Sequence, residues 1–497
     1  MRADDPYGLW PDAVEPANGP ARAVLVSILS GLLALALLVA GLAATNGFGG
    51  GATADRLLGD RTPIGGAGTD RDPAARPGPN TSPEGLPGGS TDPRSIRNTV
   101  FARVNAILPT QTAALEQNDE AAFARRFEHS DTTLVDEHRR LFRNLRRIPF
   151  DVARWSYSGN LEVVTADGSS PDRAGTAASW PVTVSMDVAF EHAIKGIDVD
   201  TVLEKYTWKA RCADPVDPCA ITAVSGAADK DTELGMAGYP AAWDLWELHV
   251  ERRPHVVLMG PERDAALIRA QADTAERAAE YTIGTWKGGP GTSPGFALVL
   301  TSSRTSFGKL YRSESVQEWV AGYALALAGR DRPVGGVRMV VDNDELVADP
   351  TFAPILLRHE MTHALVAPLY TYGFGLEVPT WFHEGFADWQ AGADARIAPE
   401  VAGNIRALIT ARRFTGELPA DADFDTADEA RVEHAYNLAH LVFRYLGETY
   451  GTERVCAFYA NTYAGKYRTM DAALRADFGV GLDEVRTGWA AWVRKAV

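Results

Sequence analysis

The chain has 497 residues, more than one ordinary hydrophobic core organises, so we expect two or three folded units joined by connecting segments. Its 49 lysines and arginines stand against 65 aspartates and glutamates, which gives a net charge of −16. This acidic balance argues against nucleic acid as a partner and against an anionic membrane surface. The three cysteines are too few for a scaffold held together by disulfide bonds.

The first apolar segment, residues 23–44, has 22 residues and no charged side chain. A helix of about 20 residues crosses a bilayer, whereas the apolar part of a cleaved signal peptide has about 7 to 15. The sequence therefore predicts a retained transmembrane helix at 23–44. Because Arg2 and Arg22 precede it and the next basic residue is Arg56, residues 1–22 are predicted to be a cytoplasmic tail. The expected location is the cell membrane, single-pass, with the bulk of the chain extracytoplasmic.

Glycine and proline dominate the segment that follows the apolar run. Residues 46–95 contain 12 glycines and 7 prolines. Such a composition cannot bury enough apolar surface to fold. Residues 45–95 are therefore predicted to be a disordered linker.

Ordered structure is expected from residue 96, where apolar residues begin to recur at helical spacing. From Val152 the pattern changes to short alternating strands separated by turn residues. Helices followed by an antiparallel sheet make an α+β domain. This order, with ALEQNDEAAFARRF before the strands, resembles the NTF2-like family over residues 96–226. Members of that family are enzymes or binding modules. No catalytic constellation is visible here, so we expect the domain to modulate rather than to catalyse, and the sequence does not identify its protein partner.

Two of the three cysteines, Cys212 and Cys219, stand close together in CADPVDPC. In an oxidising compartment they can close a short loop through a disulfide bond, which agrees with an extracytoplasmic location. Cys456 is then left single, and we expect it to be a buried thiol without a functional role.

The second predicted domain covers residues 238–497. Strands are expected at 255–260, 296–302 and 336–342, with a long helix between the first two. Helical patterns dominate after Pro350. We therefore expect an α+β domain whose C-terminal part is mostly helical.

The segment PILLRHEMTHALVAP contains His359, Glu360 and His363, and its prolines suit the first turn and the end of a helix. One helical turn separates the two histidines, so both imidazoles can reach one metal ion. Glu360 projects to a different side, from which it can take a proton from a water molecule at the metal. The pattern predicts a Zn²⁺ site with His359 and His363 as ligands and Glu360 as general base.

A further helix is predicted in PTWFHEGFADWQAG, with Glu384 and Asp388 on one face. The segment resembles the second helix of the gluzincin metallopeptidases, in particular the peptidase-MA-like group with the pattern P-x-W-x-x-E-G-x-A. The resemblance implies that Glu384 is the third zinc ligand and that Asp388 orients the first ligand histidine. Two histidines, one glutamate and an open position are typical of a catalytic zinc site. His383 is expected to point away from the metal.

The likeness to this family extends over residues 238–497, through AYNLAHLVFRYLGETYG and FGVGLDEVRTGWAAWV. In relatives, a tyrosine or histidine of this region stabilises the oxyanion. The resemblance therefore implies Tyr436 for that role, with His434 and His440 as alternatives. No GxMEN-like segment for capturing a free amino terminus is present, which favours an endopeptidase over an aminopeptidase.

These features together predict a membrane-anchored extracytoplasmic zinc metallopeptidase acting on a peptide or protein substrate. Glu360 is expected to take the proton of the attacking water and to pass it to the leaving amine. The substrate is expected to pair antiparallel with an edge strand such as 296–302 or 336–342. Two alternatives stay open: a membrane-anchored binding or scaffold protein with a degenerate zinc-peptidase domain, and a hydrolase of a non-protein amide such as cell-wall peptide.

Overall fold

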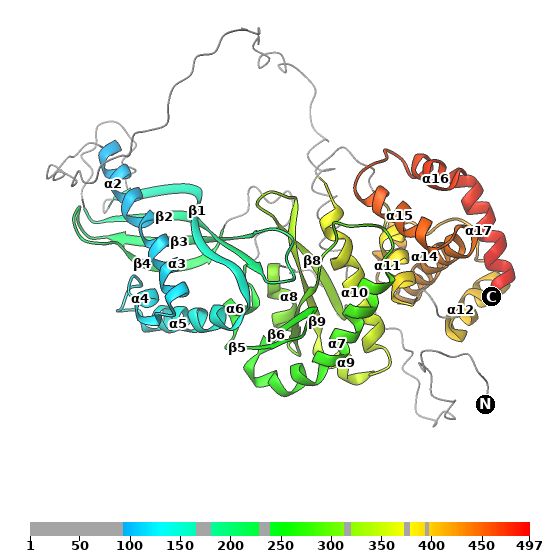
Figure 1. The fold of residues 1–497 in the computed structure, drawn as a ribbon, viewed down its shortest axis with the longest axis horizontal. Helices are drawn as coiled ribbons and strands as arrows, with labels where there is room; N and C mark the ends of the chain where they lie inside the picture. Colours follow the sequence, from blue (N-terminus) through cyan, green and yellow to red (C-terminus); the bar gives the residue numbers. More distant parts are fainter. Residues whose placement is uncertain (1–92, 166–179, 228–238, 313–319, 372–377, 393–396) are drawn as a thin grey trace, which may run out of the picture.

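The computed structural model describes residues 93–165, 180–227, 239–312, 320–371, 378–392 and 397–497. The chain is α+β, and its C-terminal part is mostly helical, as the sequence predicts (Figure 1). We refer to residues 93–226 as the first unit and to residues 239–497 as the second unit. A five-stranded sheet of the second unit lies between the first unit and the C-terminal helices (Figure 1).

The transmembrane part of the predicted fold class is corrected by the structure. No helix among the described residues is both long and apolar enough to cross a bilayer. The predicted tail 1–22, the predicted span 23–44 and nearly all of the predicted linker 45–95 lie outside the described residues. The prediction rested on length and hydropathy, which are requirements for a spanning helix but do not by themselves form one. The linker is also too long by three residues, because the first helix begins at Pro93.

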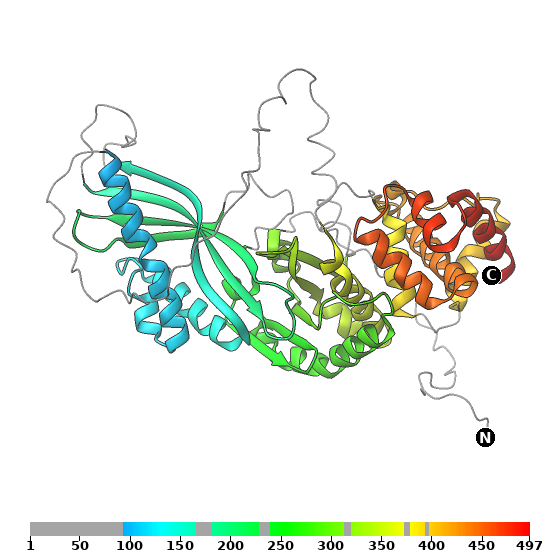
Figure 2. The ribbon, with the colours of Figure 1, turned by 45° about the horizontal axis from the view of Figure 1, so that its top comes forward.

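The first unit consists of helices followed by strands. Its helices are α2 (Pro93–Asn105), α3 (Ile107–Gln117), α4 (Glu120–Ala124) and α5 (Thr132–Arg147). Its strands are β1 (Phe150–Thr165), β2 (Val182–Ile194), β3 (Val202–Cys212) and β4 (Ala220–Gly226). They form an antiparallel sheet in the order β1-β2-β3-β4, curved with the helices against one face (Figure 2). Burial alternates along β3, as expected for a strand with one face on a core. The NTF2-like assignment of this unit stays a prediction.

A disulfide bond joins Cys212 at the end of β3 to Cys219 just before β4. It closes the turn between these two strands. Arg103 of α2 donates to the carbonyl oxygens of Asp214 and Asp217 in the same turn, at 3.1 and 2.9 Å. The third cysteine, Cys456, is buried and unpaired, and burial raises the pKa of its thiol to about 11. A thiol with so high a pKa is a poor nucleophile near neutral pH.

The sheet of the second unit has the strand order β5-β6-β7-β9-β8. The strands are β5 (Leu248–Arg252), β6 (Val256–Pro261), β7 (Phe296–Thr301), β8 (Gly322–Ala328) and β9 (Val334–Asp342). Strands β6, β7 and β9 are parallel, and β5 and β8 run antiparallel at the two edges. Every residue of β6, β7 and β9 is buried, because both faces of the sheet are covered.

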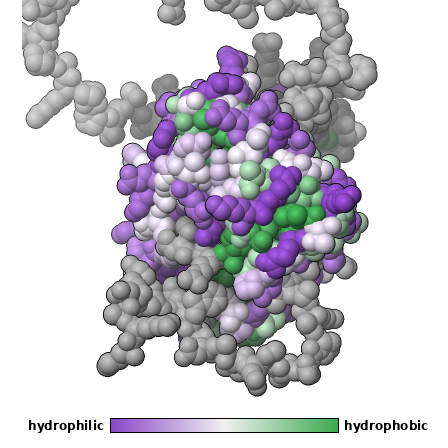
Figure 3. Space-filling model, turned by 90° about the vertical axis from the view of Figure 1, so that its right-hand side faces the viewer, coloured by the Kyte–Doolittle hydropathy of each residue, from purple (hydrophilic) through white to green (hydrophobic). Residues whose placement is uncertain are grey.

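Most helices of the second unit cover one face of this sheet or form the C-terminal bundle. They are α6 (Ala242–Leu245), α7 (Ala265–Thr285), α8 (Arg304–Lys309), α9 (Asn343–Ala348), α10 (Ala353–Val366), α11 (Thr380–Ala391), α12 (Pro399–Thr410), α13 (Asp421–Phe424), α14 (Glu429–Tyr450), α15 (Thr452–Tyr463), α16 (Met470–Phe478) and α17 (Leu482–Ala496). Short 3-10 turns occur at Glu262–Asp264, Leu310–Arg312 and Ala367–Leu369. Seen from the side of the C-terminal helices, the described surface is mostly hydrophilic, with hydrophobic residues gathered in a few patches (Figure 3).

The first unit shares a hydrophobic core with the second. Alternate residues of the five-stranded sheet face opposite ways, and one set packs with α7, α10 and the C-terminal helices. The other set lies in one cluster with the buried residues of the first unit; it comprises Val257, Met259, Ala297, Val299, Tyr323, Leu325, Leu327 and Val340. The sheet of the second unit is therefore buried between its own helices and the first unit.

Candidate functional site

Helix α10 carries the predicted HExxH motif. Pro354 occupies its first turn, where a missing backbone N–H costs no hydrogen bond. His359 and His363 are one turn apart on this helix, and their Nε2 atoms lie 3.1 Å apart. The two histidines therefore present their ring nitrogens to one point.

Helix α11 brings Glu384 to the same point. Its first residue, Thr380, donates its backbone N–H to the Asp421 carboxylate at 2.8 Å, which fixes the start of the helix. Glu384 Oε2 lies 3.3 Å from the Nε2 atom of His359 and 3.6 Å from that of His363. Gly385 follows, and a Cβ there would lie 2.4 Å from the carbonyl oxygen of Ala439. Only glycine therefore allows α14 to approach α11 so closely beside the carboxylate.

The three donor atoms fit a zinc ion. Tetrahedral zinc with bonds of about 2.0 to 2.1 Å separates its ligand atoms by about 3.3 Å. The three separations between His359, His363 and Glu384 are 3.1, 3.3 and 3.6 Å. Imidazole nitrogens and a carboxylate oxygen are donors that zinc prefers. The site is almost completely buried, because the side chains of His359 and Glu384 are at most 1% exposed and that of His363 is 10% exposed.

Asp388, one turn after Glu384, fixes the ring of His359. The Nδ1 atom of His359 donates to Asp388 Oδ1 at 2.8 Å, which leaves the Nε2 lone pair facing the other donors. Burial alone would lower the pKa of His359, but the hydrogen bonds with Asp388 and Glu384 outweigh it and raise this pKa to about 10. Burial likewise favours a neutral Glu384, yet the neighbouring His363 and His359 hold the pKa of this carboxyl well below its usual value. The raised pKa of His359 and the lowered pKa of Glu384 both show that these side chains favour a positive charge between them. A metal cation can therefore take the place of the proton.

Glu360, the predicted general base, is fully buried beside the start of strand β8. A Cβ added to Gly322 would lie 3.4 Å from Cγ of Glu360 and 3.6 Å from its Cδ. The Glu360 side chain therefore lies close to residue 322 of an edge strand, with room for no bulky side chain between them. Sequence reasoning missed Gly322, because no short motif connects it to Glu360.

The structure separates the three candidates on α14. Tyr436 is buried, and its pKa is raised well above the usual value by burial and by the nearby Glu384 carboxylate. His440 lies against Asp388, and burial lowers its pKa. Burial and the positive charge of Arg413 lower the pKa of His434, which lies about half a turn from Tyr436 toward the start of α14. Tyr436 is therefore the candidate that lies beside a predicted metal ligand.

His383 lies next to Glu384 in sequence but is held by another partner. Its Nδ1 atom lies 3.3 Å from the hydroxyl oxygen of Tyr459, and its ring meets Tyr463 edge to face. Burial and the neighbouring His363 lower the pKa of His383 to about 4. The ring is thus a neutral, packed part of the wall behind the site.

Among the described residues, one further group could hold a metal ion: His255, Glu276 and Glu280. His255 and Glu276 already satisfy each other, through Nδ1 to Oε1 at 2.7 Å and the His255 N–H to Oε2 at 3.1 Å. Glu280 is exposed. These two hydrogen bonds hold the turn between β5 and β6 against α7, which explains why the three residues lie close together.

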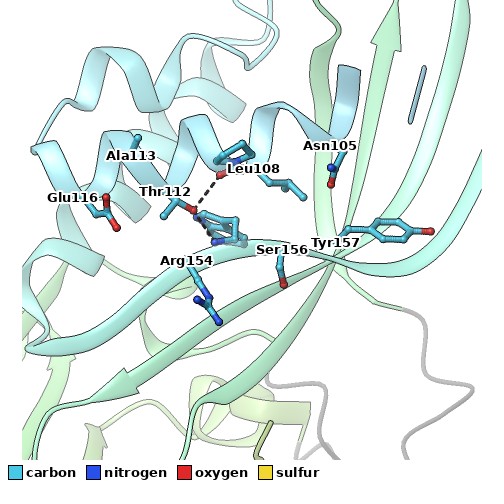
Figure 4. Close-up of a pocket in the computed structure, with 10 residues that line it drawn as sticks. Asn105, Leu108, Thr112, Ala113, Glu116, Arg154, Ser156 and Tyr157 are labelled. Carbon is cyan, nitrogen blue, oxygen red and sulfur yellow. Dashed lines mark hydrogen bonds between the residues drawn. The ribbon is translucent and has the colours of Figure 1, made fainter. Parts of the chain in front are cut away.

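A cavity of about 380 Å³ lies in the first unit, between α3 and β1 (Figure 4). Its polar walls are engaged locally: Thr112 accepts from the backbone N–H of Trp155 at 2.9 Å and donates to Leu108 O at 3.1 Å. Arg154 donates to Glu191 at 2.6 Å. The cavity is remote from α10 and α11 and belongs to a different part of the fold (Figure 1).

Comparison with known proteins agrees with this geometry. No curated protein matches the chain. A family model described as the Peptidase MA superfamily matches residues 351–495, which contain α10, α11 and α14 and thus the residues grouped at the candidate metal site. Residues 351–495 are therefore similar to the Peptidase MA superfamily, and this similarity supports a zincin-like peptidase domain in this part of the chain.

Proposed function

We propose that the chain is a zinc-dependent metallopeptidase of the gluzincin type that cleaves peptide bonds within its substrates. The observation that carries this proposal is the mutual spacing of the Nε2 atoms of His359 and His363 and Oε2 of Glu384, at 3.1 to 3.6 Å. The match to a peptidase superfamily over residues 351–495 supports it.

A zinc ion held by these three side chains would supply a Lewis acid that polarises the scissile carbonyl and acidifies a water molecule. Glu360 takes the proton of the attacking water and delivers it to the departing amine. The burial of Glu360 excludes bulk water, which strengthens its interactions with the reacting groups. The hydroxyl of Tyr436 is available to donate to the oxyanion that develops on the former carbonyl.

An edge strand for pairing with substrate is present, but it is not one of the expected segments. Residues 296–301 form β7 and residues 336–342 belong to β9, and both strands lie inside the sheet. The expectation was wrong because strand order is not visible in a short apolar run. The edge beside the site is β8, Gly322–Ala328, and a Cβ on its first residue would lie 3.4 Å from Cγ of Glu360. We propose that substrate pairs antiparallel with β8 through main-chain hydrogen bonds.

The test is metal analysis of the purified full chain, combined with cleavage of a peptide library. We expect about one zinc ion per chain, cleavage at internal bonds, and loss of cleavage with a chelator that is reversed by added zinc. Zinc without cleavage of any peptide would favour the binding-protein alternative. Cleavage confined to non-peptide amides would favour the second alternative.

A further inference from the structure

The first unit docks on the sheet of the second unit through the β2–β3 turn, residues 195–201, and through strand β3. The backbone N–H groups of Val199 and Asp200 donate to Gly335 O of β9 at 2.9 and 3.1 Å. Strand β3, which follows the turn, lies against both β8 and β9. Side chains of β3 are therefore enclosed between the two units.

A buried ion pair lies in this contact. Asp198 of the turn accepts from both terminal nitrogens of Arg338 of β9, at 2.7 and 3.0 Å, and both side chains are fully buried. A Cβ on Gly336 would lie 2.0 Å from Oδ1 of Asp198, so glycine at this position leaves room for the carboxylate. The pair fixes how the units meet, because misplacing either partner leaves a buried charge without compensation.

The terminal N–H groups of Arg338 are all engaged. Besides its two bonds with Asp198, Nη1 donates to Val337 O at 3.0 Å and Nη2 donates to Nε2 of His192 at 3.0 Å. Because Arg338 can only donate, Nε2 of His192 carries no proton. Burial and the positive charge of Arg338 also hold the pKa of His192 well below its usual value. Neither side chain therefore has a terminal N–H to offer to a second carboxylate.

Glu204 of β3 is fully buried beside this ion pair. Its Oε1 atom lies 3.9 Å from Nε2 of His192, which is too far for a hydrogen bond. Among the described residues, neither carboxylate oxygen of Glu204 has a hydrogen-bond partner. The groups of described residues that could hold a metal ion do not include Glu204. A proton is therefore the remaining means of neutralising this carboxylate.

The surroundings of Glu204 also disfavour a negative charge. The titratable or charged side chains that face it are His192 of β2, Asp198 of the turn, Tyr206 of β3, Asp244 of α6, Tyr311 of the 3-10 turn after α8, and Arg338 of β9. The one cation among them already carries the charge of Asp198. Burial raises the pKa of Glu204 well above its usual value, although Arg338 acts in the opposite direction.

We infer that Glu204 is a neutral carboxylic acid at pH 7 while the first unit is docked, and that docking weakens when this proton is lost at higher pH. Once the contact opens, water reaches Glu204, and the carboxyl ionises near its ordinary value of 4.5. Between this value and the raised pKa of the docked state, the docked chain holds one more proton than the open chain. Stability from this proton is therefore complete below pH 4.5 and is lost as the pH rises. The inference does not depend on peptidase activity.

Infrared difference spectroscopy on the full chain tests the protonation state directly. Glu204→Gln has nearly the shape of the protonated side chain and needs no proton, so this variant should fold. At pH 7, the spectrum of the parent minus that of Glu204→Gln should contain the C=O stretch of one protonated carboxylic acid. A difference that contains carboxylate bands instead overturns the inference.

Urea unfolding of the same two proteins at pH 5 and pH 7 tests the effect on stability. Each pH unit in this range should raise the unfolding equilibrium constant of the parent nearly tenfold relative to Glu204→Gln, which gives about 40- to 80-fold in total. Glu116→Gln, at an exposed position of the first unit, is the control and should follow the parent. A relative change below about tenfold overturns the inference.

Asp198→Asn tests why the proton is present. Without the charge of Asp198, Arg338 has no counter-ion, and Glu204 should ionise to supply one. The unfolding equilibrium constant of this variant should then depend on pH as weakly as that of Glu204→Gln. A folded Asp198→Asn variant with the pH dependence of the parent overturns the inference. The infrared and urea comparisons decide the question even if this variant does not fold.

Discussion

Asp388 Oδ1 accepts the Nδ1 proton of His359 at 2.8 Å, across the two helices that hold the candidate metal site. The carboxylate sets the tautomer of the ring and keeps its Nε2 atom pointing at His363 and Glu384. The contact joins α10 to α11 through one side-chain pair, so its loss should affect metal affinity more than fold.

We therefore expect Asp388→Ala to weaken zinc binding about 10- to 100-fold, measured by competition with a chromophoric chelator. Asp388→Asn, which can still accept a hydrogen bond, should lose less. Asp477→Ala removes a comparable carboxylate that accepts from Tyr467 at 3.0 Å in the C-terminal bundle, and it should leave zinc affinity unchanged. Equal zinc affinity in Asp388→Ala and the parent would contradict the assigned role.

Substitution should also separate the base from the ligand. Glu360→Gln removes a proton acceptor but no ligand, so zinc content should stay near one per chain while turnover falls about 10²- to 10⁴-fold. Glu384→Gln removes an anionic ligand, so zinc content and turnover should fall together. Metal analysis and a peptide-cleavage assay on the same preparations decide this. Parent-like cleavage by Glu360→Gln would sink the proposed mechanism.

The contact between Gly322 and Glu360 gives a third prediction. The Cβ of a valine at residue 322 would lie 3.4 Å from Cγ of Glu360, and its two methyl groups would need further space. We expect Gly322→Val to displace the carboxylate and to lower kcat at least about tenfold, with zinc retained. Gly403→Val, at a helical position where an added Cβ meets nothing within 4 Å, is the control. Similar kcat values in both variants would show that the strand does not constrain the base.

The shared core predicts the behaviour of a truncated chain. We expect residues 239–497 alone to bind a hydrophobic dye and to lack a cooperative thermal transition, because deletion uncovers the apolar face that includes Met259, Val299 and Leu325. Calorimetry of the full chain should show a single unfolding transition that involves both units. The first unit would then do more than modulate activity, because the second unit depends on it for its core. A soluble, folded and active fragment would contradict it.

His138 provides a prediction about pH. Its ring is buried, donates to Leu134 O at 2.7 Å and stacks on Phe127 with centroids 3.8 Å apart. Burial lowers its pKa from 6.5 to about 4, so the folded state resists protonation more than the unfolded state. The neutral His138 ring therefore contributes fully to the free energy of unfolding above pH 6.5. This contribution falls by about 3 kcal/mol as the pH drops to 4.

Urea unfolding of the parent and of His138→Gln at several pH values measures this contribution. The variant should lose stability less steeply between pH 6.5 and 4, because glutamine does not titrate. His129→Gln serves as the control, since residue 129 is exposed, and it should follow the parent. Identical slopes for the parent and His138→Gln would show that another group controls acid unfolding.

The sequence predicts the local part of the site well, because helical spacing is a short-range property. His359 and His363 are one turn apart on α10, and Glu384 and Asp388 one turn apart on α11, as their spacing indicates. Strand order depends on pairings between distant residues, and a one-dimensional pattern does not contain them. For this reason β7 and β9 were mistaken for edge strands, while β8 with its small residues was overlooked.

The same distinction between short-range and long-range information applies to other parts of the chain. The first two helices are separated at Ala106, and Pro109 lies in the first turn of α3, where proline is tolerated. The disulfide bond between Cys212 and Cys219 was accessible to sequence reasoning, since the two residues are only seven apart. The docking of the first unit onto the sheet was not, because it depends on Gly336 and Asp198, which carry no recognisable signature.

The ion pair between Asp198 and Arg338 can form only after the ribosome has made both residues. The two residues are 140 positions apart, and a ribosome adding about 5 to 20 residues per second needs roughly 7 to 28 s to produce the second after the first. Throughout that interval the emerging first unit presents Asp198 and an uncovered apolar surface to the cell. A nascent chain arrested before β9 should therefore be a client of molecular chaperones, whereas one released after α17 should not.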